Sequence, residues 1–261
     1  MKDKKSSRGA EIHGRIAIVD IMRSIAVINM ICYHAVWDIV NIFDIRLPWY
    51  ESVGAHIWQQ SICMTFILLS GFCADLSRKP LRRGIIVFLA GAAVSFFTML
   101  FTPSGAIFFG ILTLIGSCMI ITGLIKPLLS KCDPRTGFVL SAVLFVFTRN
   151  IPRGCIGFEG LNIYRLPEFL YRGYLSAFFG FPGKSFVSAD YFPIIPWMFL
   201  FFSGYFFGKF TDKEKYRGRK NNSNIPAVFT FISKNALVIY MLHQPVVYII
   251  LKLILGIPVP K

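Results

Sequence analysis

Asp20-Ile-Met-Arg23-Ser-Ile-Ala-Val-Ile-Asn-Met-Ile-Cys-Tyr-His34-Ala-Val-Trp-Asp38 is apolar and long enough to cross a membrane as a helix, yet it holds four ionisable residues. These residues fall on one face of a helix with about 3.6 residues per turn, together with Val27. Arg23 and His34 are separated by roughly 16 Å along its axis. Inserting one charge costs about 2.5–3.5 kcal/mol, whereas each Leu or Ile returns about 0.5 kcal/mol. We therefore expect this face to line a polar interior and to have a function.

The composition of the whole chain is that of a membrane protein. Of its 261 residues, 55% are hydrophobic and 16% charged, and the mean hydropathy is +0.60. Long apolar runs recur along nearly the full length, which excludes an ordinary soluble domain. We predict an all-α fold, a polytopic transmembrane helix bundle. Residues 15–256 form its single domain, between a basic cytoplasmic tail (1–14) and a short C-terminal tail (257–261).

The net charge of +15 is carried by short basic segments between the apolar runs, such as 77–83 and 209–220. Lys and Arg concentrate in cytoplasmic loops of membrane proteins, so this pattern predicts orientation, with the N-terminus inside and the C-terminus outside. The expected partners are membrane lipids with anionic headgroups, and no nucleic acid. The six cysteines lack metal-ligand spacing, so we expect no metal.

The apolar runs predict about seven spans, at 15–40, 53–76, 84–101, 106–125, 137–148, 190–210 and 225–255. The fifth run is short of the length normally needed to span, so a re-entrant segment is the alternative. The last run is overlong, and Pro245 is expected to kink it. An outer loop, 149–189, is the longest connection, and its aromatic part, 169–179, is expected to form an interfacial helix.

His34 is the best candidate for a general base, and Asp38, one turn later, is expected to orient its imidazole. The alternative is a structural histidine hydrogen-bonded between helices. The planar guanidinium of Arg23 suits a phosphate or carboxylate, and the alternative is a structural pair with Asp20.

Two further polar segments interrupt the apolar runs, His243-Gln244-Pro245 and Asp190-Tyr191. A lone helical histidine is commonly structural, and an acidic residue at a helix N-terminus commonly caps the sixth span. If these segments meet the first helix they would form a site, to which His56 is a further candidate contributor. A phosphate-binding glycine loop, a nucleophile elbow and a zinc-protease motif are absent from the sequence.

The motifs together resemble those of integral-membrane acyltransferases, in which an Arg and a His separated by ten residues mark the first helix. More narrowly, the chain is similar over about residues 15–250 to the family of the heparan-α-glucosaminide N-acetyltransferase catalytic domain. The motifs that carry this resemblance, besides Arg23 and His34, are Phe66-Ile-Leu-Leu-Ser70-Gly71-Phe, Phe109-Gly110-Ile-Leu, Ser188-Ala-Asp190-Tyr191-Phe-Pro193-Ile-Ile-Pro196-Trp197 and Tyr240-Met-Leu-His243-Gln244-Pro245.

The resemblance implies a transmembrane acyltransferase that moves an acyl group, expected to be acetyl, from cytoplasmic acyl-CoA to an amine or hydroxyl of a carbohydrate-type acceptor outside. Acetyl-CoA would be the co-substrate, a bacterial plasma membrane the expected location, and a homo-oligomer stays open. In part of the family the catalytic histidine follows the first helix, where His56 is the nearest counterpart. Many bacterial members have a histidine where this chain has Thr113. The predicted roles are catalytic for His34 and Asp38, donor-binding for Arg23 and Asp20, and acceptor-binding for Asp190, Tyr191, Trp197, His243, Gln244 and His56.

Two other classes of protein compete with this interpretation. A transporter could use buried Asp, Arg and His side chains to relay protons or carry an anion. The sequence shows neither an internal repeat nor paired broken helices, which such folds often contain. A non-catalytic assembly partner would not require the polar face of the first helix.

Overall fold

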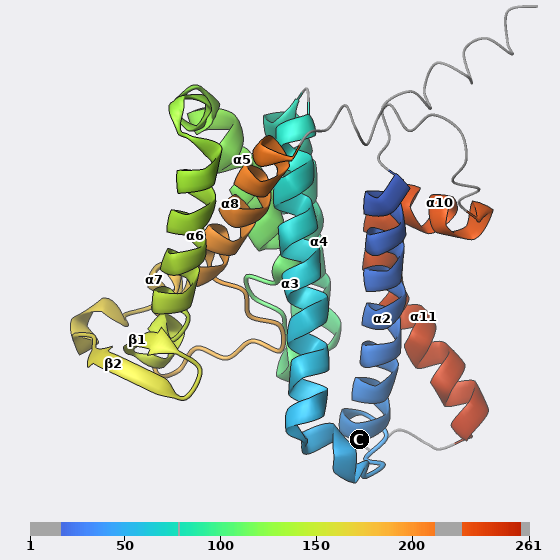
Figure 1. The fold of residues 1–261 in the computed structure, drawn as a ribbon. Coiled ribbons are helices and arrows are strands. Elements are labelled where there is room, and N and C mark those ends of the chain that lie inside the picture. Colours follow the sequence, from blue (N-terminus) through green and yellow to red (C-terminus); the bar gives the residue numbers. More distant parts are fainter. Residues whose placement is uncertain (1–16, 78, 212–225, 257–261) are drawn as a thin grey trace, which may run out of the picture. The chain divides into compact units, whose positions relative to one another are not determined.

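The computed structural model describes residues 17–77, 79–211 and 226–256 (Figure 1). The predicted tails, 1–14 and 257–261, lie outside these residues, as does most of the basic segment 209–220. The chain divides into two compact units. The first comprises residues 1–66 and 212–261, and the second residues 67–211. Each unit is described by itself.

The described chain is mostly helical, and five of its helices are long and apolar enough to cross a membrane. This confirms the prediction of a helical integral membrane protein. The five helices are α2 (Ala17–Asn41), α3 (Val53–Leu76), α4 (Pro80–Phe101), α5 (Ile111–Lys131) and α11 (Ala236–Leu255).

Two other helices coincide with predicted spans but are shorter than these five helices. They are α6 (Pro134–Thr148), with 15 residues, and α8 (Ile194–Phe210), with 17. At a rise of 1.5 Å per residue they extend roughly 22 and 26 Å, against a hydrocarbon core of about 30 Å. The seven-span arrangement therefore stays a prediction.

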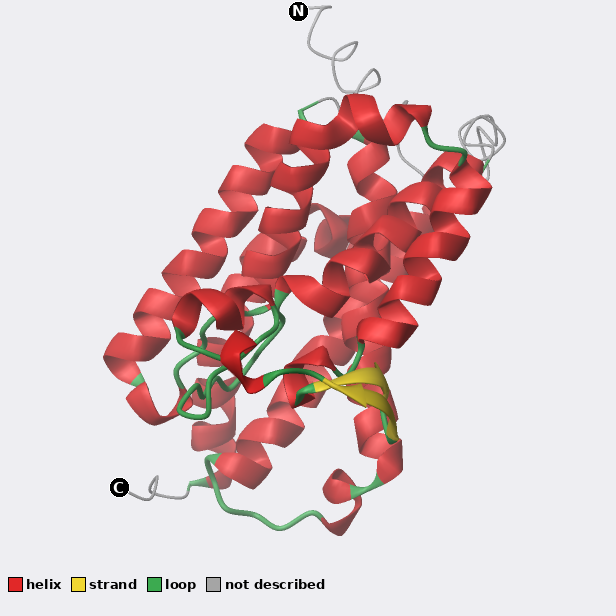
Figure 2. Cartoon of the chain, turned by 90° about the vertical axis from the view of Figure 1, so that its left-hand side faces the viewer, coloured by secondary structure: helices red, strands yellow, loops and turns green. Residues whose placement is uncertain are grey.

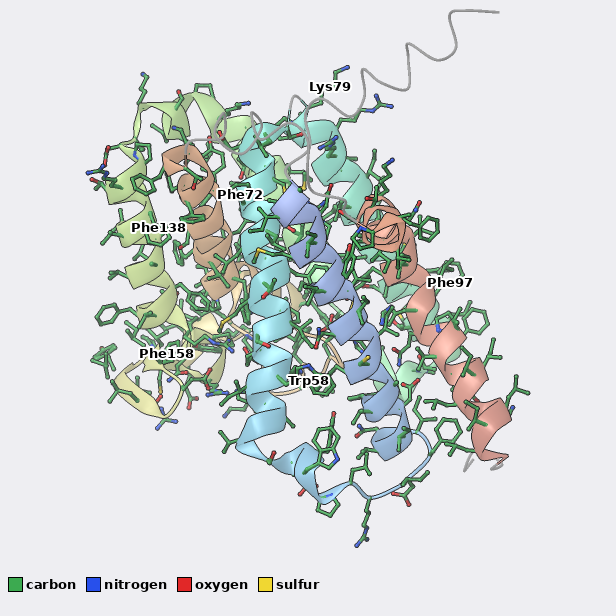
Figure 3. The ribbon with its side chains drawn as sticks, turned by 45° about the vertical axis from the view of Figure 1, so that its right-hand side comes forward. Trp58, Phe72, Lys79, Phe97, Phe138 and Phe158 are labelled. Carbon is green, nitrogen blue, oxygen red and sulfur yellow. The ribbon has the colours of Figure 1, made fainter. Side chains whose placement is uncertain are left out.

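Many large apolar side chains are exposed on the helix surfaces. Phe97 of α4 is 55% exposed and Phe138 of α6 is 37% exposed, and both are labelled in Figure 3. Such surfaces are unfavourable in water but natural against lipid chains.

In the first unit, α10 (Ala227–Lys234) and α11 pack against α2, and a short 3₁₀ turn (Pro48–Glu51) precedes α3. The predicted single helix over 225–255 is wrong, because the chain breaks at Asn235, whose φ and ψ are −104° and 15°. Figure 1 shows α10 turned away from the axis of α11. Asn is a poor residue for a helix interior because its amide competes for backbone partners, here the carbonyl of Phe231. Pro245 lies inside the continuous helix α11.

In the second unit, α4 packs along α5, and α6 packs along α8. Close contacts between these helices depend on glycine. At Gly116, an added Cβ would lie 2.4 Å from the backbone nitrogen of Phe88. At the α3–α8 contact, a Cβ on Gly204 would lie 2.2 Å from the carbonyl oxygen of Leu68. Small residues thus let these backbones touch.

The connection between α6 and α8 departs from the all-α prediction. Strands β1 (Cys155–Phe158) and β2 (Leu161–Arg165) form an antiparallel hairpin, drawn in yellow in Figure 2. The buried Asn150 amide shapes its turn by donating to the carbonyls of Glu159 (2.7 Å) and Leu161 (3.2 Å). The predicted interfacial helix over 169–179 is reduced to a 3₁₀ turn (Glu168–Leu170) and to α7 (Tyr174–Phe179).

Candidate functional site

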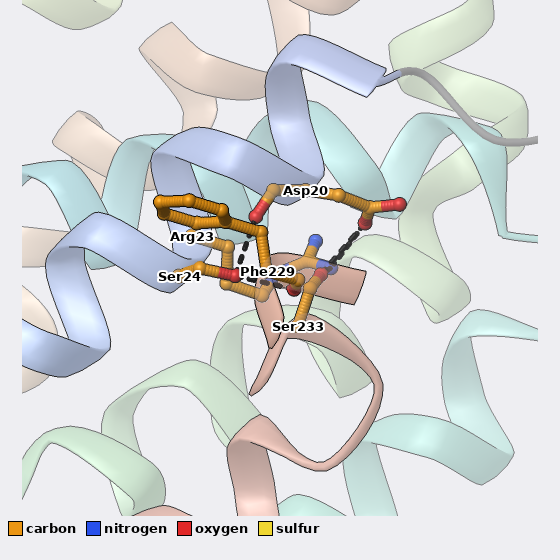
Figure 4. A network of polar contacts seen from close by, with 5 residues as sticks. All are labelled: Asp20, Arg23, Ser24, Phe229 and Ser233. Carbon is orange, nitrogen blue, oxygen red and sulfur yellow. Dashed lines mark hydrogen bonds and ion pairs between the residues drawn. The ribbon is translucent and has the colours of Figure 1, made fainter. Parts of the chain in front are cut away.

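The N-terminal half of the polar face of α2 meets α10 in a buried polar network, shown in Figure 4. The hydroxyl of Ser233 donates to Asp20 Oδ1 at 2.7 Å and accepts from Arg23 Nη1 at 3.1 Å. The hydroxyl of Ser24 lies 2.8 Å from the Asp20 carbonyl and 2.7 Å from the Phe229 carbonyl. Two serines thereby fasten α10 to α2 and fix the charged side chains between them.

Arg23 and Asp20 also form the ion pair expected three residues apart, at 3.5 Å. The Arg23 side chain keeps 25% of its surface exposed, whereas that of Asp20 keeps 9%. The carboxylate of Asp20 is therefore buried. The guanidinium of Arg23 is oriented by its partners but remains partly exposed. Ser233, 210 residues away from Arg23 in the chain, is a site residue that the sequence analysis missed.

The C-terminal half of the same face meets α11. The rings of His34 and His243 lie edge to face, with centroids 4.8 Å apart. Asp38 lies one turn after His34 on α2, and its Oδ1 accepts a hydrogen bond of 2.5 Å from the amide of Gln244, the residue after His243. Later residues of α11 thus meet later residues of α2, so the two helices run in the same direction. The predicted meeting of the His243-Gln244 segment with the first helix is found in this unit.

The predicted contact between Asp38 and His34 is wrong. Asp38 is fully buried and pairs with Gln244, while its Oδ2 lacks a hydrogen-bond partner among the described residues. The orienting bond is made at the other histidine, where Nδ1 of His243 lies 2.5 Å from the carbonyl oxygen of Tyr240. A carbonyl can only accept, so this bond places the proton of neutral His243 on Nδ1 and the lone pair on Nε2.

Aromatic side chains gather around the connection between α2 and α3. Trp58 Nε1 donates to Asn29 Oδ1 at 3.1 Å, and the rings of Trp58 and Tyr33 lie 5.3 Å apart. The Tyr33 hydroxyl is 3.3 Å from that of Tyr50. His56 is exposed in the first turn of α3. Asn29 could have indicated this cluster from the sequence, because an amide inside an apolar run needs a hydrogen-bond partner.

In the second unit, the segment that contains Asp190 is tied to the start of α5. The backbone nitrogen of Phe192 donates to the Phe109 carbonyl at 2.9 Å, and Asp190 Oδ2 accepts from the Ile111 nitrogen at 3.4 Å. A Cβ on Gly110 would come within 3.0 Å of that carboxylate oxygen. The two family-like motifs around Gly110 and Asp190 are therefore one structural junction.

The possibility that Asp190 caps the sixth span is not realised. The helix α8 begins only at Ile194, after Pro193, so the carboxylate lies instead at the N-terminus of α5. Burial raises the pKa of Asp190 to about 6, opposed by the hydrogen bond from Ile111. Burial also raises the pKa of Tyr191, whose hydroxyl donates to the Ala177 carbonyl at 2.5 Å.

Trp197 is only 3% exposed and packs on Phe145 and Phe192. The guanidinium of Arg149 lies 4.5 Å from its ring centre, and Arg149 also pairs with Glu159 at 3.3 Å. The indole is thus enclosed by its own unit. Arg149 is a second residue that the sequence analysis did not single out, since its role depends on a neighbour distant in sequence.

Among residues 17–77, 79–211 and 226–256, no group of three or more His, Cys, Asp or Glu side chains is arranged to hold a metal ion. The structure is that of a helical integral membrane protein in which histidine, carboxylate, amide and guanidinium groups gather where α2 meets α10 and α11. The family model described as "Heparan-alpha-glucosaminide N-acetyltransferase, catalytic" matches residues 15–245, and the chain belongs to that family. Membership implies acyltransferase activity of the membrane N-acetyltransferase type. Neither a curated protein nor a solved structure matches the chain.

Proposed function

We propose that this protein transfers an acetyl group from cytoplasmic acetyl-CoA to an amine or hydroxyl of a glycan-type acceptor on the outer face of the membrane. The observation that carries this proposal is the pairing of His34 and His243 on the polar face of α2, with Arg23 held further along the same face. A thioester is already a good electrophile, but the acceptor must lose a proton, so a positioned imidazole is the minimum requirement.

The donor would be held by Arg23 and Asp20. The guanidinium of Arg23 is a bidentate group suited to a phosphate of CoA, and Asp20 and Ser233 keep it oriented. The roughly 16 Å of helix between Arg23 and His34 is comparable to the reach of an extended pantetheine arm. His34 would act as general base at the thioester, and Asp38 would act through Gln244 rather than on His34 directly.

In the first unit, taken by itself, we propose that His243, Gln244 and His56 bind the acceptor. For the second unit, taken by itself, the residues proposed for acceptor binding are Asp190 and Tyr191. Trp197 is enclosed, so it would contribute by holding Arg149 rather than by touching the acceptor. Each of these roles is a proposal for a single residue, and each can be tested separately.

We further propose seven spans with the N-terminus inside and the C-terminus outside, in a bacterial plasma membrane. The parallel course of α2 and α11 supports this topology, because helices that start on the same side end on the same side. It requires the short helices α6 and α8 to span, which local thinning of the bilayer allows.

The test is release of free CoA by the purified full-length protein in lipid nanodiscs, given acetyl-CoA and a panel of amino sugars and neutral sugars. Release that depends on an acceptor supports the proposal. His34→Ala should lower turnover by about 10²–10⁴-fold while acetyl-CoA still binds. Absence of CoA release with every acceptor, combined with acetyl-CoA-independent uptake of a solute in proteoliposomes, would favour the transporter alternative.

A further inference from the structure

Three buried side-chain atoms at the junction of α2 and α11 lack a hydrogen-bond partner among the described residues. They are Asp38 Oδ2, Gln244 Oε1 and His243 Nε2. Asp38 is 0% and His243 8% exposed, and the three residues are linked because Gln244 follows His243 and bonds to Asp38. A buried polar atom without a partner loses its hydration and gains nothing in return, so such a cluster needs an explanation.

All three atoms are acceptors. The Gln244 amide uses its donor end toward Asp38, which leaves its oxygen free. Nδ1–H of His243 donates to the Tyr240 carbonyl, so Nε2 carries the lone pair and is an acceptor. A carboxylate accepts at both oxygens, and one of them is unused at Asp38. A ligand that satisfied all three atoms would have to donate three hydrogen bonds.

The charge of Asp38 narrows the choice of ligand. Among the described residues Asp38 forms no ion pair, and its hydrogen-bond partner is the neutral amide of Gln244. A buried carboxylate without a cation is costly, and the cost is largest at membrane depth. A primary ammonium brings three N–H donors and one positive charge, whereas a hydroxyl brings one donor and none. Asp38 also lies within one turn of Asn41, the last residue of α2, so it is close to one end of the helix.

We propose that Asp38, His243 and Gln244 form a seat for a primary ammonium group. That this ammonium is the acyl acceptor rests on the proposed function, whereas its binding does not. The seat assigns Asp38 to ligand recognition rather than to orienting His34. It also assigns the first proton acceptor to His243, whose tautomer is fixed, beside His34.

The transfer then balances as follows. The ammonium gives one proton to His243 Nε2, and the neutral amine nitrogen attacks the thioester carbonyl. The C–N bond forms, the C–S bond breaks, and CoA leaves as a thiolate. His34 takes the second proton from the nitrogen. One of the two protons goes to the thiolate and the other is released, so the products are the amide, CoA and one proton.

The experiment is equilibrium binding to the full-length protein in nanodiscs, without acetyl-CoA. The probes are glucosamine, glucose and N-acetylglucosamine, which differ only in the group at one carbon. We expect glucosamine to bind at least roughly tenfold more tightly than the other two, as charge-assisted hydrogen bonds do. Equal affinity for glucose and glucosamine overturns the seat, and this comparison needs no variant.

Asp38→Asn keeps the shape of the side chain and replaces the free acceptor by a donor. It should reduce the preference for glucosamine to within about twofold, while acetyl-CoA affinity is unchanged. Asp44→Asn, an exposed aspartate of the same unit, is the matched control and should keep the preference. If Asp38→Asn does not fold, Gln244→Met removes one acceptor and should lower the preference.

A preference retained in either folded variant overturns the assignment of these residues. Failure of the proposed function has a different signature, because glucosamine preference would persist while no sugar supports CoA release from acetyl-CoA. Acetyl transfer together with an unchanged glucosamine affinity in Asp38→Asn would instead refute the seat and leave the proposed function standing.

Discussion

Ser233→Ala tests whether Arg23 is held in advance for the acyl-CoA donor. The Ser233 hydroxyl bridges Asp20 Oδ1 at 2.7 Å and Arg23 Nη1 at 3.1 Å. Ordering a free arginine side chain costs about 1.5–2 kcal/mol, so full loss of its orientation would weaken binding roughly 10- to 30-fold. Because Asp20 still holds the guanidinium at 3.5 Å, we expect half of that free energy, a roughly 3- to 5-fold weakening.

The measurement is the dissociation constant of acetyl-CoA by titration calorimetry of the protein in nanodiscs. Ser61→Ala is the control for loss of a hydroxyl, since Ser61 is exposed and its hydroxyl donates to the Trp58 carbonyl of its own helix. Ser24→Ala is the control for looser docking of α10. It removes the 2.7 Å contact with the Phe229 carbonyl without touching the Arg23 guanidinium.

A double-mutant cycle decides the outcome. If Ser233 acts through Arg23, Ser233→Ala should have no further effect on acetyl-CoA affinity in an Arg23→Ala background. The same weakening in both backgrounds would refute the reasoning. So would unchanged affinity in Ser233→Ala when Arg23→Ala binds poorly, because the hydroxyl would then be irrelevant to the orientation of the guanidinium.

Three further predictions concern other parts of the chain. Asp190 has a pKa raised from 3.8 to about 6 in the folded state, so the wild type loses stability as pH rises between these values. Asp190→Asn keeps an acceptor for the helix and should flatten this dependence in thermal unfolding; an unchanged pH profile would contradict it. Labelling of single-cysteine proteins from outside should reach Cys155 and not Cys132, and the reverse pattern would exclude the N-in topology. Gly204→Ala should destabilise the fold by about 1–3 kcal/mol, because its Cβ meets a backbone oxygen at 2.2 Å. Gly105→Ala, with nothing within 4 Å, should leave the melting temperature unchanged.

The class of protein followed from local properties of the sequence. Length and hydropathy of a run are enough to predict a membrane helix, and α3 begins and ends at the predicted residues, Val53 and Leu76. The shared face of Arg23 and His34 followed from helical period alone. Family motifs then pointed to the acyltransferase class before any contact was known.

The short breaks could not be predicted in the same way. Asn235 ends α10 after eight residues in a run that is apolar on both sides. The hairpin after α6 depends on Asn150, whose amide finds carbonyls nine and eleven residues later. In both places a single polar side chain outweighs the hydrophobic pattern, because an unsatisfied backbone group is costlier than a lost apolar contact.

The partner of each polar side chain was decided only by the tertiary structure. Asp38 could bond to His34 one turn away, yet it bonds to Gln244, 206 residues later. Asp190 could cap the helix that follows it, yet it lies at the start of α5, 79 residues earlier. The sequence by itself determined which residues are polar within apolar helices and on which face they lie, since both are properties of one helix. Which acceptor meets which donor depends on how separate helices pack, because a hydrogen bond forms only at contact distance and in the right direction.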